Sequence, residues 1–496
     1  MEEQANESDI KTQPKPARTF FGQPVALKTL FMTEFWERFS YYGMRAILLY
    51  YMYDATVRGG LGMSVQLATS IMAIYGALVF MTSVIGGFIS DRLIGSARSV
   101  LYGGLLIMFG HILLSMPFKI AGLYGSILLI TLGTGLLKPN VSETVGALYA
   151  PDDPRRDSAY SIFVMGINLG SLMAPLLVSW VGQSYNYHAG FSLAALGMAL
   201  GLVGYIRKMK SLPAASQVAP DPLPKALRQR YLKRTGWGLV GLGLVLGGFA
   251  LTHHLTANGI VLGLTILGVC LPIYYFIVML TSPKVSAVER RHLKAYIPLF
   301  ICEVLFCLIL EQGGVVLALF AQDQTQLQVG SWHLQAGQFQ SLNPLFIILY
   351  SPIFAWLWTK LGTKQPTAAT KFAWSLIFSG LSFLIMAIPV LMVGTARVSP
   401  LWLVASWAIL EIGELLLSPI GLSVTSTLAP TAYKSQMMSM WFLGNAAAQA
   451  LNSQIVRFYT PQNEVAYFTI IGGITIVAAI IMFALVPAIN RQMQDA

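Results

Sequence analysis

The stretch EFWERFSYYGMR, residues 34–45, places two glutamates and two arginines inside a long apolar run. At roughly 100° per residue, five of its residues, including all four charged ones, fall within about 100° of one another on a helix. They are Glu34, Glu37, Arg38, Tyr41 and Arg45. An ionisable side chain within a bilayer is costly unless it is paired or faces a water-filled cavity. The stretch therefore predicts a membrane helix whose charged face lines a polar pathway.

The composition is that of a membrane protein. The chain has 496 residues, of which 55% are hydrophobic and only 11% are charged, whereas a soluble domain carries roughly 25% charged residues. Apolar segments repeatedly reach the roughly 20 residues that cross a bilayer as a helix. We predict an all-α membrane protein with fourteen spans near 25–53, 64–90, 98–118, 121–149, 157–182, 187–207, 236–257, 259–281, 296–320, 341–360, 371–394, 399–420, 434–456 and 465–488.

The spans fall into groups of six, two and six, separated by basic stretches. The start lacks the apolar core and small-residue cleavage site of a signal peptide. The expected organisation is a cytoplasmic N-terminal tail at 1–24, a six-helix bundle at 25–207, a basic cytoplasmic linker at 208–235, two extra helices at 236–281, a cytoplasmic connector at 282–295 and a second six-helix bundle at 296–490. Two bundles joined in this way are typical of a transporter that rocks around a site at the midplane.

The chain has a net charge of +11, and its positive residues are divided unevenly between the two sides of the membrane. With the tail inside, 25 of the 32 Lys and Arg residues fall in cytoplasmic segments, and four fall on the far side. This asymmetry follows the positive-inside rule. We therefore expect a multi-pass protein of the cytoplasmic (inner) membrane with both termini in the cytoplasm, and we expect no nucleic-acid partner.

Ten ionisable residues lie within the expected spans: Glu34, Glu37, Arg38, Arg45, Lys138, Glu143, Glu303, Glu311, Glu411 and Glu414. One interpretation is that they form fixed salt bridges between helices. Fixed buried ion pairs are, however, weak sources of stability compared with apolar packing. The three cations lie in the first bundle and four glutamates lie in the second. Pairs that form in one conformation and break in another explain this distribution better.

Several motifs resemble known transporters. GGFISDRLIGSARS, at the end of the second span, resembles the signature loop of the major facilitator superfamily. Glu34, Glu37 and Arg38, followed by FSYYG, match the ExxERFxYYG motif of the proton-dependent oligopeptide transporter family. FVMGINLGSL, residues 163–172, is similar to that family's second signature. The segments around Lys138, Glu311, Asn343, Glu414 and Trp441 also resemble bacterial members. The likeness covers nearly the whole chain and implies the major facilitator fold.

The resemblance implies a site for di- and tripeptides. A peptide is a zwitterion, and its two termini attract charges of opposite sign. The residues implied to hold the peptide carboxylate are Arg38, Tyr42 and Lys138. Those implied to hold the ammonium and backbone are Asn168, Asn343 and Glu414. Those implied to shape the side-chain pockets are Tyr41, Ser418 and Trp441.

The resemblance also implies proton-coupled symport by alternating access. Glu311 would attract Arg45 when charged and release it when neutralised, which would close and open the external side. Lys138 and Glu414 would do the same on the internal side, and Glu34 and Glu37 beside Arg38 would form a further proton-sensitive group. The expected partners are peptides, protons and membrane lipid, and we expect a monomer. The proton gradient would supply the energy, without a cofactor or metal.

Some features leave the assignment open. Phe80 stands where many family members have a tyrosine, and Glu303 and Glu411 match no family motif. Plant relatives that carry nitrate keep the ExxER charges, so a proton-coupled carrier of nitrate or another small anion is the alternative. Glu414 argues against it, because an anion carrier has little use for a carboxylate at that position.

An enzyme is disfavoured, since no nucleophile motif, nucleotide loop or metal-ligand spacing accompanies the glutamates.

Overall fold

The computed structural model describes residues 19–150, 153, 155–224, 256–393 and 396–493, together with scattered residues within 227–241. Most of the N-terminal tail and most of the span expected at 236–257 therefore lie outside the described residues. Thirteen helices of 20 residues or more occur in the part that is described. Eleven stretches there are long and apolar enough to cross a membrane. The predicted all-α membrane architecture is confirmed for the residues that the structure describes, and the expected count of fourteen spans includes one that lies mostly outside them.

The first bundle follows the expected spans to within a few residues. Its helices are α1 (Val25–Tyr53), α2 (Val65–Ile89), α3 (Ser96–Ser115), α4 (Lys119–Gly146), α5 (Arg156–Ser184) and α6 (Tyr187–Lys208). The strands β1 (Thr19–Phe20) and β2 (Gln23–Pro24) form a small antiparallel hairpin before α1. Helix starts carry side-chain caps where the sequence offers them, as at Ser64 before α2 and Asn186 before α6.

The remaining long helices are α9 (Ala257–Thr281), α10 (Ala287–Glu311), α12 (Leu342–Leu361), α13 (Ala368–Val393), α14 (Leu401–Thr427), α15 (Lys434–Ile455) and α16 (Glu464–Met493). The shorter elements are η1 (Thr56–Arg58), the π-helical turn η2 (Ser90–Ile94), η3 (Met209–Ser211), α7 (Ala214–Gln217), η4 (Gln312–Gly314), α11 (Val316–Asp323), β3 (Gln328–Val329), β4 (Trp332–His333), η5 (Ala336–Ser341), η6 (Gly362–Lys364), η7 (Thr431–Tyr433) and η8 (Val456–Phe458). Strands β3 and β4 pair in an antiparallel hairpin.

Two helix boundaries in the second bundle differ from the expected spans. Helix α10 begins at Ala287, so most of the connector expected at 282–295 is helical. The cause is a capping box, in which Ser286 and Glu289 each bond the other's backbone N–H. The span expected at 296–320 is also not one continuous helix, because η4 interrupts it between α10 and α11.

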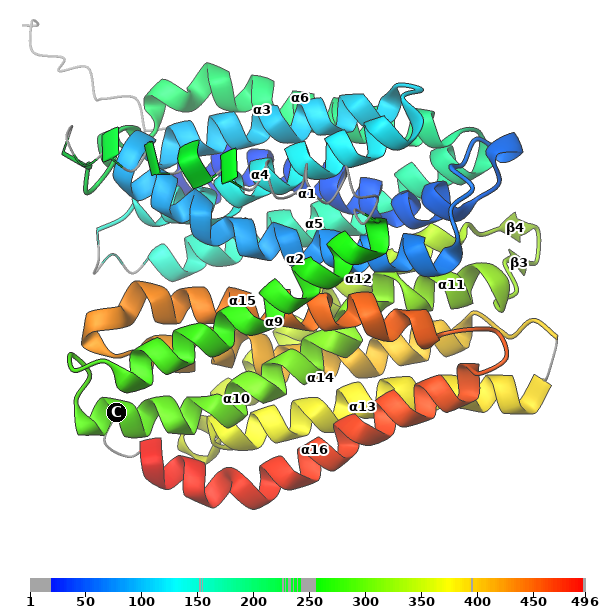
Figure 1. The fold of residues 1–496 in the computed structure, drawn as a ribbon. Coiled ribbons are helices and arrows are strands. Elements are labelled where there is room, and N and C mark those ends of the chain that lie inside the picture. Colours follow the sequence, from blue (N-terminus) through cyan, green and yellow to red (C-terminus); the bar gives the residue numbers. More distant parts are fainter. Residues whose placement is uncertain are drawn as a thin grey trace, which may run out of the picture.

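Helix α9 is not simply a lipid-facing helix. Residues recurring every three or four positions, from Val261 to Met279, are buried on one face. On that face Thr265 Oγ1 lies 2.7 Å from Ser453 Oγ of α15, and α9 also contacts α2. Figure 1 shows α9 running obliquely across the molecule. Helix α9 therefore packs across helices of both bundles.

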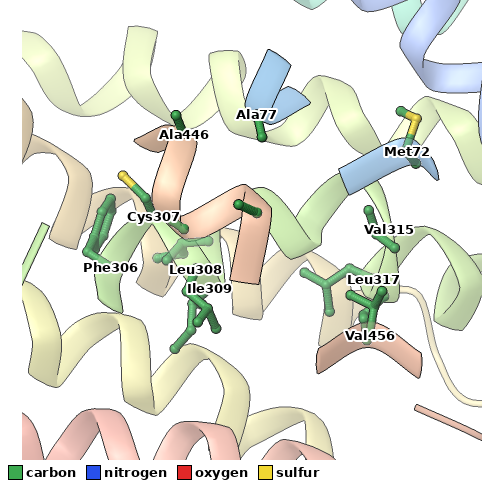
Figure 2. Packing of buried hydrophobic residues seen from close by; sticks show 14 of the residues in the cluster. Met72, Ala77, Phe306, Cys307, Leu308, Ile309, Val315, Leu317, Ala446 and Val456 are labelled. Carbon is green, nitrogen blue, oxygen red and sulfur yellow. The ribbon is translucent and has the colours of Figure 1, made fainter. Parts of the chain in front are cut away.

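The two bundles lie on opposite sides of a shared interface. Figure 1 shows α1, α3, α4 and α6 in the upper half and α10, α13, α14 and α16 in the lower half, with α2 and α15 between them. One apolar core continues through this interface. In Figure 2, Ala77 of α2 lies beside Ala446 of α15, and Met72 of α2 lies near Val315, at the start of α11. This part of the interface is closed by side-chain packing.

The segment after the first bundle is fastened to the end of α2. Arg92 Nη1 lies 2.6 Å from Asp221 Oδ2, and the backbone N–H groups of Asp221 and Leu223 donate to the carbonyls of Asp91 and Arg92, each at 3.1 Å. Gly95, with φ of +80°, follows η2, and a Cβ there would lie 2.8 Å from the backbone of Val218. The loop that resembles the superfamily signature thus holds the beginning of the linker against the first bundle.

A close contact between α13 and α16 gives a stability prediction. A Cβ on Gly472 would lie 2.8 Å from the carbonyl of Gly380, whereas a Cβ on the next residue, Gly473, would contact nothing within 4 Å. We expect Gly472→Ala to lower the free energy of unfolding by about 1–3 kcal/mol through overpacking. Gly473→Ala should leave it unchanged or raise it by up to about 1 kcal/mol. Thermal unfolding of both variants in detergent tests this, and equal midpoints would contradict it.

Candidate functional site

Three charged residues of α1 form a buried cluster. Arg38 Nε donates to Glu34 Oε1 at 2.7 Å and lies 2.7 Å from Glu37 Oε2. All three side chains are buried. One turn of helix separates Glu34 from Arg38, which brings their side chains within reach. The buried polar face predicted from the spacing of this stretch is confirmed.

A second ion pair joins the two bundles. Arg45 Nη2 of α1 lies 2.5 Å from Glu311 Oε2, at the end of α10. The two side chains are only 11% and 12% exposed. Gly314, in the turn that interrupts this span, leaves room for the guanidinium, since a Cβ there would lie 3.2 Å from Arg45 Nε. The break after α10 therefore lets Arg45 reach Glu311.

A row of amides on α15 supports this pair, and the sequence analysis missed it. Asn445 Nδ2 donates to Glu311 Oε1 at 3.3 Å, and Gln449 Nε2 donates to Asn445 Oδ1 at 2.9 Å. Gln449 in turn packs directly against Gly76 of α2. Asn445, Gln449 and Asn452 recur at intervals of four and three residues. That helical spacing of amides was the available signal.

Lys138 of α4 occupies a different setting from the two arginines. Its Nζ lies 4.1 Å from the centre of the Phe80 ring of α2, within the range of a cation–π interaction. It forms no ion pair with Glu414 or with any other residue that the structure describes. The phenylalanine that replaces the family tyrosine thus faces the lysine and offers it a ring instead of a hydroxyl.

Two carboxyls of α14 share one amide from α12. Asn343 Nδ2 donates to Glu411 Oε1 at 2.7 Å and to Glu414 Oε2 at 3.4 Å. Glu411 is completely buried, whereas Glu414 is partly exposed. The three-residue spacing places both carboxyls on the same side of α14. Asn343 fixes their positions relative to α12.

Two of the cavities between the bundles are lined by the residues described above. One of about 200 Å³ is lined by Tyr42, Arg45, Phe80, Leu310, Glu311, Gly314, Gln340, Asn343, Trp407, Glu414 and Asn445. One of about 900 Å³ is lined by residues that include Lys138, Asp91, Asp221, Tyr275 and Gln436. Since Phe80 lines the smaller cavity and Lys138 the larger, their contact lies between the two. The smaller cavity brings charged residues of both bundles together.

The remaining predicted site residues line neither cavity. Tyr41 is buried, with its ring centre 5.2 Å from that of Tyr42. Asn168 Nδ2 donates to the carbonyl of Val164 on its own helix, at 3.0 Å. Trp441 packs on Gly421, where any Cβ would overlap its ring. Ser418 is half-buried one turn beyond Glu414. The structure therefore assembles Tyr42, Arg45, Glu311, Asn343 and Glu414, with Lys138 adjacent.

The sequence also matches a known family. A sequence model of the POT family matches residues 97–475. The chain belongs to the POT family. It is 51% identical to the uncharacterised transporter YclF of Bacillus subtilis (strain 168), over 99% of this chain and 98% of that one. It is 46% identical to the di-/tripeptide transporter of Lactococcus lactis subsp. lactis (strain IL1403), over 97% of this chain and 99% of that one.

A POT family structure aligns over almost the whole chain. The crystal structure of the peptide transporter POT in complex with sulfate is 52% identical, covers 96% of this chain and 97% of that one, and superposes with a TM-score of 0.95. The predicted major facilitator architecture is thereby confirmed. This POT family member is a multi-pass membrane transporter and not an enzyme.

Proposed function

We propose that the chain is a proton-coupled symporter that imports di- and tripeptides across the cytoplasmic membrane by alternating access. The observation that carries this proposal is the cavity between the bundles lined by Glu414, Asn343 and Phe80, with Lys138 of the neighbouring larger cavity in contact with the Phe80 ring. A short peptide presents an ammonium and a carboxylate, and these need a carboxylate and a cation. The names of the Lactococcus and POT relatives agree with such a substrate.

The same site supports the choice of peptides over nitrate. Two glutamates, Glu411 and Glu414, share the amide of Asn343 beside the cavity. The negative charge of Glu414, which lines the cavity, would repel a small anion but attract an ammonium. The termini are common to all short peptides, so recognition of termini accounts for tolerance of varied side chains. Arg38 and Tyr42 would add donors for the peptide carboxylate, while Asn168, Tyr41, Ser418 and Trp441 would act in an arrangement other than the present one.

Proton coupling would act through the pair that joins the bundles. Protonation of Glu311 removes the charge that holds Arg45, so it favours separation of α1 from α10. The Arg45–Glu311 pair lies at the end of α10, and the 900 Å³ cavity lies near the ends of α2 and α4. Those ends are the ones expected in the cytoplasm. The present arrangement would thus be closed outside and hollow inside, and Lys138 and Glu414 would pair when the inside closes.

The remaining parts of the proposal concern energy and setting. The inward proton gradient would drive accumulation, since protonation outside and release inside favour different arrangements. No cofactor is needed for this cycle. The transporter would act as a monomer in the inner membrane, with both termini in the cytoplasm and lipid around its apolar helices.

The decisive experiment is uptake of labelled dialanine by proteoliposomes. With an inward proton gradient we expect accumulation above the external concentration, and with the gradient collapsed by an ionophore we expect equilibration only. Excess unlabelled dialanine should compete with the label, and nitrate should not. Accumulation that ignores the gradient would contradict the symport mechanism. Competition by nitrate alone would favour the anion alternative.

A further inference from the structure

Glu411 is a buried carboxyl beside the ammonium site that the proposed transport cycle does not use. It lies on α14, one turn before Glu414, and its side chain is completely buried. Oε1 accepts a hydrogen bond from Asn343 Nδ2 at 2.7 Å. Oε2 has no hydrogen-bond donor in the part of the chain that the structure describes. The carboxyl is therefore only half satisfied by its neighbours.

The charged and titratable groups around Glu411 offer no positive charge. On its own helix it contacts the carboxyl of Glu414, within hydrogen-bonding reach. From α12 it faces Asn343 and, further away, Tyr350. Glu311 of α10 interacts electrostatically with Glu414, but Glu311 is itself an acid and is already paired with Arg45. Among the described residues of α13 and α15, no charged side chain interacts electrostatically with Glu411.

Two ionised carboxylates cannot lie together in this setting without a cation. Like charges in contact repel strongly where water is excluded, and a pair of carboxyls at one site avoids this by keeping one proton. The amide nitrogen of Asn343 already donates to both members of this pair, one oxygen of each. A proton on one carboxyl is then the remaining source of a donor between them. It removes one charge and turns the contact into an O–H···O hydrogen bond.

The proton belongs on Glu411 and not on Glu414. Glu414 lines the cavity, where an ionised carboxylate can bind an ammonium, while Glu411 does not line it. We propose that Glu411 is held as a neutral carboxylic acid that donates a hydrogen bond to the carboxylate of Glu414 and positions it for a cationic group. That the cationic group is a peptide ammonium rests on the proposed function, whereas the protonation of Glu411 does not.

Infrared spectroscopy tests the protonation directly. In purified protein at neutral pH, the spectrum of the wild type minus that of Glu411→Gln should contain the C=O stretching band of one protonated carboxylic acid. Glu414→Gln should shift the frequency of that band, because the hydrogen-bond acceptor of Glu411 changes. Absence of the band from the difference spectrum would show that Glu411 is ionised and would overturn the proposal. This readout needs no transport, so it stands even if peptide uptake fails.

Uptake kinetics test the positioning role. Glu411→Gln keeps a neutral donor of the same shape, so its KM for dialanine and its pH profile should match those of the wild type. Glu411→Ala removes the donor, and loss of a hydrogen bond to a charged group should raise KM about tenfold or more. A shifted pH profile in Glu411→Gln would mean that Glu411 exchanges its proton during transport. Equal damage by both substitutions would mean a role other than donation, and either result would overturn the proposal.

Discussion

Lys138→Ala is expected to abolish the concentrative uptake of dialanine. Arg38 and Arg45 are each held by glutamates, whereas Lys138 makes no ion pair with any residue that the structure describes. Its ammonium is therefore available for the carboxylate of a peptide. Removal of one partner from a desolvated charge pair costs roughly 2–5 kcal/mol, or about thirtyfold to several thousandfold in affinity. Initial uptake rates into proteoliposomes under a proton gradient measure the effect.

The chain supplies a matched control for this substitution. Lys371 of α13 is also buried, and its Nζ lies 3.9 Å from the centre of a tryptophan ring, that of Trp358. It lines neither of the two interface cavities. Lys371→Ala should therefore change uptake by no more than about twofold. Normal accumulation by Lys138→Ala, or equal loss in both variants, would contradict the role assigned to Lys138.

Glu311→Gln is expected to separate peptide exchange from proton-driven accumulation. The amide keeps the shape of the side chain but can no longer ionise, so it cannot hold Arg45 in a charge-dependent way. Accumulation driven by a proton gradient should fall about tenfold or more, in line with typical coupling energies between sites. Exchange of labelled for unlabelled dialanine across the membrane should persist, because exchange needs no net proton movement. Both assays use the same proteoliposomes.

An exposed ion pair beyond the end of α1 serves as the control. Arg58 Nη2 lies 2.5 Å from Asp54 Oδ1, just after α1, and the arginine side chain is 72% exposed. Exposed pairs contribute little, with a median of about 0–1 kcal/mol. Arg58→Gln should leave both accumulation and exchange near the wild-type level. Undiminished accumulation by Glu311→Gln would remove the Arg45–Glu311 pair from the coupling mechanism.

Much of the architecture could be predicted from periodicity and charge. The spacing of residues 34–45 was sufficient to place Glu34, Glu37 and Arg38 on one buried face, because a helix fixes the angle between successive side chains. The start of α10 was predicted nine residues too late, at 296 instead of Ala287. Charged residues at its first turns conceal a helix from a hydropathy pattern, although Ser286 and Glu289 carry the capping signal that marks its beginning.

Contacts between helices were less predictable. The three-residue spacing of Glu411 and Glu414 indicated a shared face, but it gave no sign that Asn343 of α12 bonds to both. The contact of Phe80 with Lys138 and that of Asn445 with Glu311 depend likewise on how two helices are rotated against each other. The spacing of residues in one sequence predicts which side chains share a helix face. It does not predict which residues of another helix that face contacts.

The attachment of the linker to the end of α2 decides which half of the molecule carries it. Asp221 and Leu223 are bonded to Asp91 and Arg92, so the stretch up to Leu223 moves with the first half. Pro220 and Asp221 also line the larger cavity. Part of the wall of that cavity is therefore linker, and it travels with the first half when the two halves separate.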